Sequence, residues 1–137
     1  MAETRPPLVA ALEWSGDLAF TATAGTHTVS IDGDSKRGLS PMQYAALGIA
    51  GCMSADVVDI LRKGRHQLTA LKVTFRGFRA EKPPRRFTAI NLHFAIGGSV
   101  PTEAVERAIA LSREKYCSVW HSFRQDIELS IDFQITP

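Results

Sequence analysis

The sequence predicts an α+β protein, because segments with strand-like alternation of hydrophobicity flank two helix-like segments. In chain order these segments form a β-meander, a long helix, two strands, a second helix and a final strand. At 137 residues and 15.0 kDa the chain has the length of one domain, so we expect residues 1–137 to form a single domain. A chain of this size buries about two-thirds of the surface that it exposes when unfolded, enough for a core without disulfides.

The first part of the chain is expected to form the meander. Turn-forming residues separate its strand-like runs at Ser15-Gly16-Asp17, at Gly25 and at Asp32-Gly33-Asp34. The three runs occupy residues 8–14, 19–24 and 28–31.

The first helix is expected to begin at a capping box. Ser40 is a favourable N-cap, Pro41 suits the first helical position, and Gln43 stands three residues after Ser40. We expect the helix to run to about Lys63, with Gly64 as its stop signal.

This helix is apolar on nearly every face, so we expect it to be buried all round. Its length would suit a membrane span, but Asp56 and Asp59 would be costly inside a bilayer, so we expect no membrane association. One small domain can hardly surround such a helix. A subunit interface is the natural extra cover.

The second half of the chain supplies two more strands, a helix and a last strand. The alternating apolar positions of the strands begin with Leu71, Val73 and Phe75, resume from Phe87 to Ile96 after a turn at residues 81–86, and recur from Ile127 to Ile135. The second helix is expected from about Pro101 to about Lys115.

The composition excludes some classes of function. With 45% hydrophobic residues, 22% charged residues and a net charge of +2, nothing in the overall charge points to a polyanionic partner. Two cysteines are too few for a disulfide framework, and the four histidines share no metal-ligand spacing. The N-terminal residues MAETRPPLVA predict no signal peptide. We therefore expect a cytoplasmic protein with reduced thiols, no metal and no cofactor.

The two cysteines are the candidate chemical groups. Cys52 lies in the middle of the first helix, where it is either a small packing residue or a reactive thiol. Asp56 follows four residues later on the same helix face, and its negative charge would disfavour a thiolate. Cys117 follows Arg113 and Lys115 at the end of the second helix, where we expect partial exposure.

Three stretches together resemble the OsmC/Ohr superfamily, and their order and spacing match over about residues 8–136. The stretches are SPMQYAALGIAGCMSADVVDILRKGR, FTAINLHFAIGG and AIALSREKYCSV. The chain is most similar to the small OsmC-like branch. The resemblance implies an OsmC-like fold and an intertwined homodimer whose central helices lie between sheets.

The resemblance also implies a thiol peroxidase that acts in oxidative stress. Cys52 would be the peroxidatic thiol, which a hydroperoxide oxidises to a sulfenic acid. Cys117 would be the resolving thiol, which forms a disulfide with Cys52, and a dithiol reductant would restore both thiols.

The sequence departs from the family's peroxidases at two positions. Those enzymes carry an Arg in the turn after the first strand and a Glu directly after the proline that begins the helix. Here the turn reads SGDL, and Met42 follows the proline. Gln43, Arg113 and Glu114 are the candidates for supporting groups. The alternative function is a non-catalytic dimer that binds a small apolar or sulfur-containing ligand.

Two further features have simple structural interpretations. Residues 62–86 hold nine of the sixteen Lys and Arg residues, and we expect a solvated hairpin rather than a nucleic-acid surface. Four further side chains are candidates for the lining of a pocket beside the cysteines, and such a pocket would suit an organic peroxide. They are Met42, Tyr44, Trp120 and Phe123.

Overall fold

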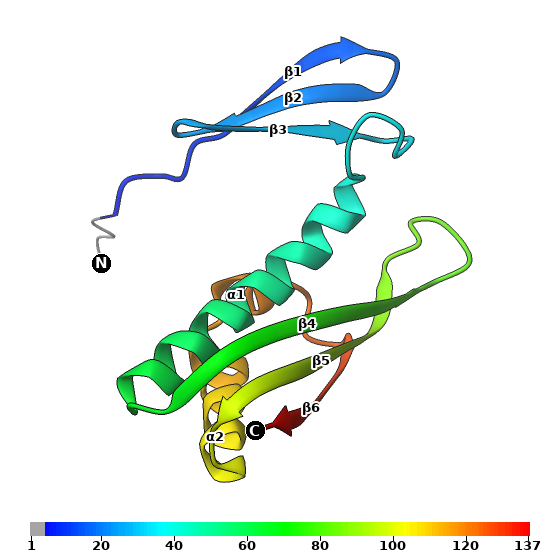
Figure 1. Ribbon diagram of the computed structural model, residues 1–137. Coiled ribbons are helices and arrows are strands. Elements are labelled where there is room, and N and C mark those ends of the chain that lie inside the picture. The colour runs from blue at the N-terminus through cyan, green and yellow to red at the C-terminus, as the bar shows by residue number, and fades with distance from the viewer. Residues whose placement is uncertain (1–4) are drawn as a thin grey trace. The chain divides into compact units, whose positions relative to one another are not determined.

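The computed structural model describes residues 5–137 and divides into two compact units, one ending at Ala45 and the other comprising Ala46–Pro137 (Figure 1). Each unit is built around its own three-stranded sheet. The long helix α1 (Pro41–Lys63) begins in the first unit and belongs mainly to the second.

The first unit is an antiparallel meander, as the sequence predicts. Its strands are β1 (Ala11–Gly16), β2 (Ala19–Ala24) and β3 (His27–Asp32), in the spatial order β1-β2-β3. The turn into β2 passes through Gly16 and Asp17, which both have positive φ. Such backbone angles favour small or turn-forming residues, which accounts for this sequence between the strands.

A loop leads from β3 to α1 and is organised by the buried carboxylate of Asp32. This carboxylate accepts backbone hydrogen bonds from Asp34 at 2.8 Å and from Arg37 at 2.9 Å. These donors lower the pKa of Asp32, because they stabilise its charged form.

Helix α1 begins with the predicted capping box. The Ser40 backbone N–H donates to Gln43 Oε1 at 2.8 Å, and the Gln43 backbone N–H donates to Ser40 Oγ at 3.1 Å. The end of the helix differs from the prediction in one detail. The residue with positive φ is Arg65, not Gly64, and the bond from the His66 N–H to the Leu61 carbonyl completes a Schellman motif. Gly64 instead leaves room for His66, because a Cβ at residue 64 would lie 2.9 Å from a ring carbon of that side chain.

The second unit contains a mixed sheet. Its strands are β4 (Gln67–Arg79), β5 (Phe87–Ser99) and β6 (Glu128–Thr136), in the order β4-β5-β6. β4 pairs with β5 antiparallel, and β5 pairs with β6 parallel. A parallel partner requires a crossover, and α2 (Thr102–Leu111) lies in that connection.

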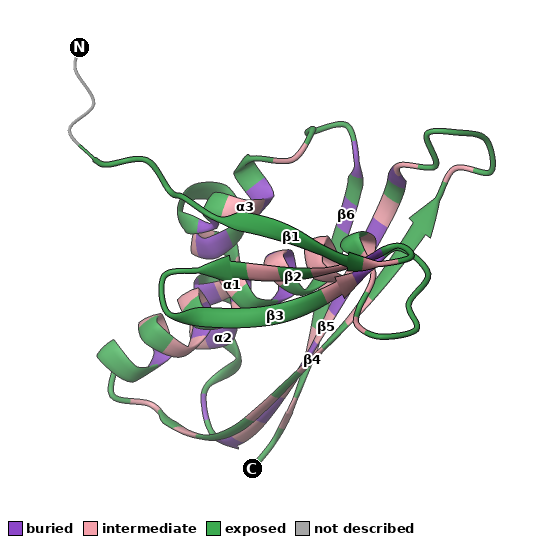
Figure 2. Ribbon diagram, turned by 90° about the horizontal axis from the view of Figure 1, so that it is seen from above, coloured by how far each residue is buried: buried purple, intermediate pink, exposed green. Residues whose placement is uncertain are grey.

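One face of this sheet forms the core together with the helices. Figure 1 and Figure 2 place α1 and α2 on the same side of the sheet. Buried positions alternate along β5 and recur every fourth residue along α1, as expected for elements that each turn one side to a common core. The fully buried residues include Ile90, Leu92, Phe94 and Ile96 of β5, Ile49, Met53, Val57 and Leu61 of α1, and Val105 and Ala108 of α2.

The second helical segment is more broken than the sequence predicts. α2 stops at Leu111, and the chain continues as a π-helical turn, η1 (Ser112–Tyr116), and a short helix, α3 (Ser118–His121). A single regular helix to Lys115 was therefore the wrong expectation. π-helical turns are rare and are often associated with functional sites, so this turn directs attention to Cys117 just after it.

Helix α1 is buried along one stripe rather than all round. Its buried residues are Ile49, Ala50, Met53, Val57 and Leu61, whereas Leu47 is 53% exposed. By length and composition alone α1 could span a membrane, with a mean hydropathy of 1.5. Core helices of soluble proteins also meet that criterion. The first unit likewise exposes apolar side chains such as Trp14, at 69%.

Candidate functional site

The structure brings the two cysteines together in the second unit. Cys52 lies on α1 and is half-buried, whereas Cys117 lies between η1 and α3 and is fully buried. Partial exposure of Cys117 was therefore the wrong expectation. The chain turns inward after η1 instead of continuing along an exposed helix.

The pKa of the Cys117 thiol shows what surrounds it. This pKa is raised from its usual 9.0 to about 11. Burial is the largest cause, and the neighbouring Cys52 and Asp56 contribute to the same rise. Cys52 acts both as a hydrogen-bonding partner and through its charge. A hydrogen bond raises the pKa of an acid when it stabilises the protonated form. The raised pKa keeps Cys117 protonated at neutral pH, and its causes place Cys52 next to it.

The backbone around Cys117 fixes the position of its sulfur. The Cys117 N–H donates to the Ser112 carbonyl at 2.8 Å and closes the π turn. The Trp120 N–H donates to Cys117 Sγ at 3.3 Å, so the side chain caps α3. This donor opposes the rise in the pKa of Cys117, but burial outweighs it.

A carboxylate completes the cluster. Ser112 is fully buried, and its hydroxyl donates to Asp56 Oδ2 at 2.8 Å. Asp56 lies one turn after Cys52 on α1, as the sequence predicts, and its charge acts on Cys117. The bond from Ser112 thus connects the middle of α1 to the π turn that positions Cys117.

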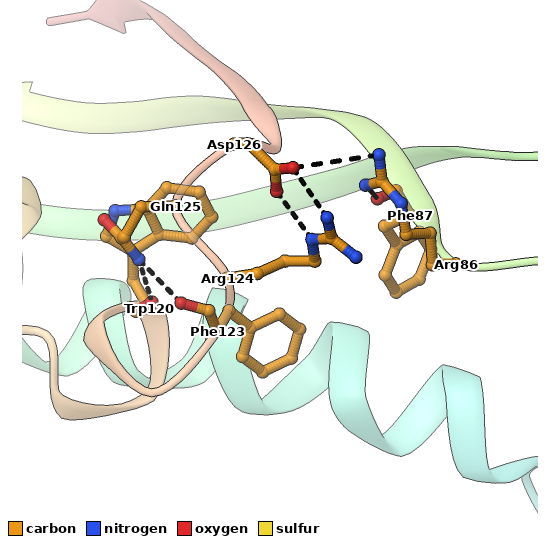
Figure 3. A network of polar contacts seen from close by, with 7 residues as sticks. All are labelled: Arg86, Phe87, Trp120, Phe123, Arg124, Gln125 and Asp126. Atoms are coloured by element: carbon orange, nitrogen blue, oxygen red, sulfur yellow. Dashed lines mark hydrogen bonds and ion pairs between the residues drawn. The ribbon is translucent and has the colours of Figure 1, made fainter.

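The loop after α3 is held by a polar network (Figure 3). The Gln125 side chain donates to the Trp120 carbonyl at 3.1 Å and to the Phe123 carbonyl at 2.8 Å. Arg124 Nε donates to Asp126 Oδ1 at 2.6 Å, and Arg86 lies 4.0 Å from the same carboxylate. Because these contacts link the end of α3 to the start of β5, they support the backbone that carries Cys117.

The predicted supporting residues lie elsewhere. The side-chain oxygen of Gln43 is engaged in the capping box of α1. Arg113 and Glu114 are exposed and line a surface hollow of about 400 Å³ with residues of α2 and β6, and neither cysteine lines it.

The predicted pocket residues are also divided. Tyr44 belongs to the first unit, where its hydroxyl donates to the Ser30 carbonyl at 2.7 Å, and Met42 precedes it on the first turn of α1. Trp120 is buried just after Cys117, and Phe123 follows in the loop that ends α3.

The turn after the first strand contains no arginine, but the side chain of Arg37 lies against it. The Arg37 guanidinium donates to the Gly16 carbonyl at 2.9 Å and lies 3.4 Å from an Asp17 carboxylate oxygen. The contact could not be expected from the sequence, because Arg37 lies in the loop between β3 and α1.

The outer face of the second sheet carries a separate polar network. Asn91 donates to Ser130 Oγ and to Asp132 Oδ2, both at 3.0 Å, and His93 pairs with Asp132. These contacts lower the pKa of Asp132, with His93 the largest cause.

Lys72 and Arg76 of β4 are exposed, as a solvated hairpin requires. Within residues 5–137 no three His, Cys, Asp or Glu side chains are grouped so that they could hold a metal ion.

Comparison with known proteins shows the same fold in several structures. A hypothetical protein from Aquifex aeolicus is 29% identical, with a TM-score of 0.90 over 96% of this chain and 98% of that one. An organic hydroperoxide resistance protein from Elizabethkingia anophelis has a TM-score of 0.70 over 98% of this chain and 100% of that one, at 15% identity. At that identity the second likeness shows the fold alone.

The sequence comparisons define the family. Residues 32–132 match the OsmC-like protein family, and Protein YhfA of Escherichia coli K12 is 36% identical over 129 residues, 92% of this chain and 96% of that protein. The α+β fold with a thiol on its central helix is thus that of an OsmC-like protein. The chain belongs to the OsmC-like family, and the predicted fold class and family are confirmed.

Sequence reasoning missed Ser112 as a member of the site. In the sequence, Ser112 stands among the small and apolar residues of the second helical segment. The signal that could have identified Ser112 was its hydroxyl among apolar neighbours, because a buried hydroxyl requires a hydrogen-bond partner.

Proposed function

We propose that this protein is a cysteine-based peroxidase that reduces organic hydroperoxides through Cys52 and Cys117. The observation that carries the proposal is the meeting of the two thiols, which come from segments far apart in the sequence. A thiol pair that merely filled the core would need neither this proximity nor one partly accessible member.

The reaction begins at Cys52, because it is the more accessible sulfur. Its thiolate attacks the outer oxygen of the hydroperoxide, the O–O bond breaks, and the products are an alcohol and a Cys52 sulfenic acid. The Cys117 sulfur then attacks the Cys52 sulfur, a disulfide forms, and the hydroxyl leaves as water. A dithiol reductant finally reduces the disulfide and is itself oxidised.

We further propose that the working form is a homodimer in a reducing compartment such as the cytoplasm. The apolar side chains on the exposed faces of α1, together with Trp14 and Leu12, support this proposal. Large apolar side chains that a protein exposes often mark an interface with a partner.

A second candidate function is a non-catalytic dimer that binds a small apolar or sulfur-containing ligand. The site's electrostatics favour it: Asp56 lies beside the thiols, and within residues 46–137 no cation forms an ion pair with this carboxylate. A thiolate is disfavoured near an unpaired negative charge.

Hydroperoxide consumption distinguishes the two functions. We expect the wild type to consume cumene hydroperoxide in the presence of a dithiol, and Cys52→Ser to abolish turnover. Cys117→Ser should allow a single oxidation and accumulate the Cys52 sulfenic acid, which a dimedone adduct reveals by mass. Ser54→Ala is the matched control, because the Ser54 hydroxyl bonds only to the Ala50 carbonyl of its own helix.

The expected rate is low, because the Glu that follows the proline in the family's peroxidases is Met42 here. Loss of a charge-assisted group from a preorganised site typically costs about 10²–10³-fold. Met42→Glu alone should not restore the rate, since Arg37, the arginine at the SGDL turn, already donates to the Gly16 carbonyl and pairs with Asp17. Consumption no faster than with the dithiol alone, with Cys52 unmodified in excess hydroperoxide, would support the ligand-binding function instead.

A further inference from the structure

A hollow of about 320 Å³ lies between the end of α1 and α2, and neither cysteine lines it. Its apolar lining comes from Ile60 and Leu61 of α1 and from Ala104 and Leu111 of α2. Leu61 is buried and the other three are half-buried, so these side chains form the floor of the hollow. Sites for small molecules begin at about 300 Å³, so a ligand of this hollow would be small.

The polar part of the lining is basic. Lys63, His66 and Arg107 line the hollow, and no Asp or Glu does. The Lys63 ammonium pairs with Asp59 at 2.9 Å, whereas Arg107 forms no ion pair within residues 46–137. Of the two permanent charges at the hollow, the guanidinium of Arg107 is therefore the one that is available to an anion.

The backbone holds the imidazole ring of His66 at this hollow. The His66 backbone N–H donates to the Leu61 carbonyl at 3.0 Å, which fixes the turn that ends α1. The half-buried ring lies so close to Gly64 that a Cβ there would be 2.9 Å from its Cδ2. Within residues 46–137 neither ring nitrogen has a hydrogen-bond partner. A half-buried imidazole that is fixed in place and has no partner can donate to an anion in the hollow.

We propose that this hollow binds a small organic anion that has a carboxylate group and a short apolar chain. The carboxylate accepts hydrogen bonds from Arg107 and His66, and the chain lies on the floor formed by α1 and α2. The planar guanidinium of an arginine matches the two oxygens of a carboxylate. An apolar lining with a few converging polar groups is the usual composition of a small-molecule site.

The two parts of the lining distinguish this ligand from simpler ones. An inorganic anion such as phosphate would leave the apolar floor in contact with water, and each methylene buried there is worth about fourfold in affinity. A neutral apolar molecule would leave the guanidinium without a partner. A hydrogen bond to a charged group typically contributes about tenfold or more.

Titration of the reduced, full-length protein with three probes at constant ionic strength tests the proposal. The probes are octanoate, octanol and inorganic phosphate. We expect octanoate to bind at least about tenfold more tightly than either of the others. In ¹⁵N NMR spectra, the shifts that octanoate causes should concentrate at residues 60–66 and 104–111. No thiol chemistry is involved, so the outcome is independent of the peroxidase proposal.

Three variants identify the groups that bind the probe. Arg107→Gln should weaken octanoate binding at least about tenfold, and because Arg107 is exposed and unpaired, the fold should be retained. Arg62→Gln is the matched control, because Arg62 is exposed on the last turn of α1 but does not line the hollow. That control should leave octanoate binding unchanged. Ala104→Phe fills the hollow without changing its charge and should abolish octanoate binding.

Four results would overturn the proposal. Octanol binding as tightly as octanoate would mean that the cations have no role, and phosphate binding as tightly would mean a site for inorganic anions. Equal weakening in Arg107→Gln and Arg62→Gln would mean that general positive charge attracts the probe. Octanoate shifts that avoid residues 60–66 and 104–111 would mean that octanoate does not enter the hollow.

Discussion

The buried thiol of Cys117 should make the protein less stable in alkali, by an amount that the structure allows us to work out. The pKa of Cys117 is about 11 in the folded chain, against a usual 9.0. Below pH 9 both folded and unfolded chains hold the proton, and stability does not depend on this group. Between pH 9 and 11 the unfolded chain loses the proton while the folded chain keeps it.

The sign and size follow from proton linkage. Because the folded pKa is raised, the contribution is complete below the unfolded pKa and is lost as pH rises through the folded pKa. Each pH unit in the middle of that interval costs about 1.4 kcal/mol, so the loss is about 2 kcal/mol at pH 11 and levels off just below about 3 kcal/mol at higher pH. A small domain is typically stable by about 5–15 kcal/mol, so the effect is measurable.

Urea unfolding of reduced protein at a series of pH values between 8 and 10.5 measures this loss. Wild type and Cys117→Ala are compared at one protein concentration, since association would otherwise change the midpoint. Lysines and tyrosines titrate in both proteins and cancel from the difference. Cys52→Ala should retain most of the slope, because burial is the largest cause of the raised pKa. If wild type and Cys117→Ala lose stability in parallel, the thiol is not shielded as described.

Two other predictions concern surfaces. Light scattering at micromolar concentration should give the mass of a homodimer, with α1 in or near an interface above about 2,000 Å² in total. A stable, folded species of 15.0 kDa would contradict this. Nucleic-acid binding by the basic hairpin at residues 62–86 should be weak and should disappear by about 200 mM salt, as expected of exposed, unspecific charge. Sub-micromolar binding that survives such salt would instead indicate a nucleic-acid surface.

The sequence predicted those parts of the fold that depend on local chemistry. The capping box of Ser40 and Gln43 requires only residues three apart, and it forms as expected. The alternation along β5 likewise depends on strand geometry alone, and Ile90, Leu92 and Phe94 all face the core. One local signal was misleading because two residues competed for the same position at the end of α1. There Arg65 rather than Gly64 adopts the positive φ.

The candidate site depended on contacts that no local pattern contains. The spacing of Cys52 and Asp56 on one helix was readable, because one turn of helix fixes it. The π turn at Ser112 was not, because it accompanies a hydrogen bond to Asp56, a residue far away in the sequence. The burial of Cys117 followed from that turn, so its expected exposure was wrong for the same reason.

The raised pKa of Cys117 bears on both directions of the proposed cycle. Oxidation begins at the accessible Cys52, and Cys117 follows as a thiol that must release a proton. Reduction must also begin at the accessible sulfur, so the reductant's thiolate attacks Cys52 and expels Cys117. A thiol with a raised pKa is a poor leaving group as a bare thiolate. Dithiol reduction of the Cys52–Cys117 disulfide of the proposed cycle should therefore be slow, although Cys52 is accessible.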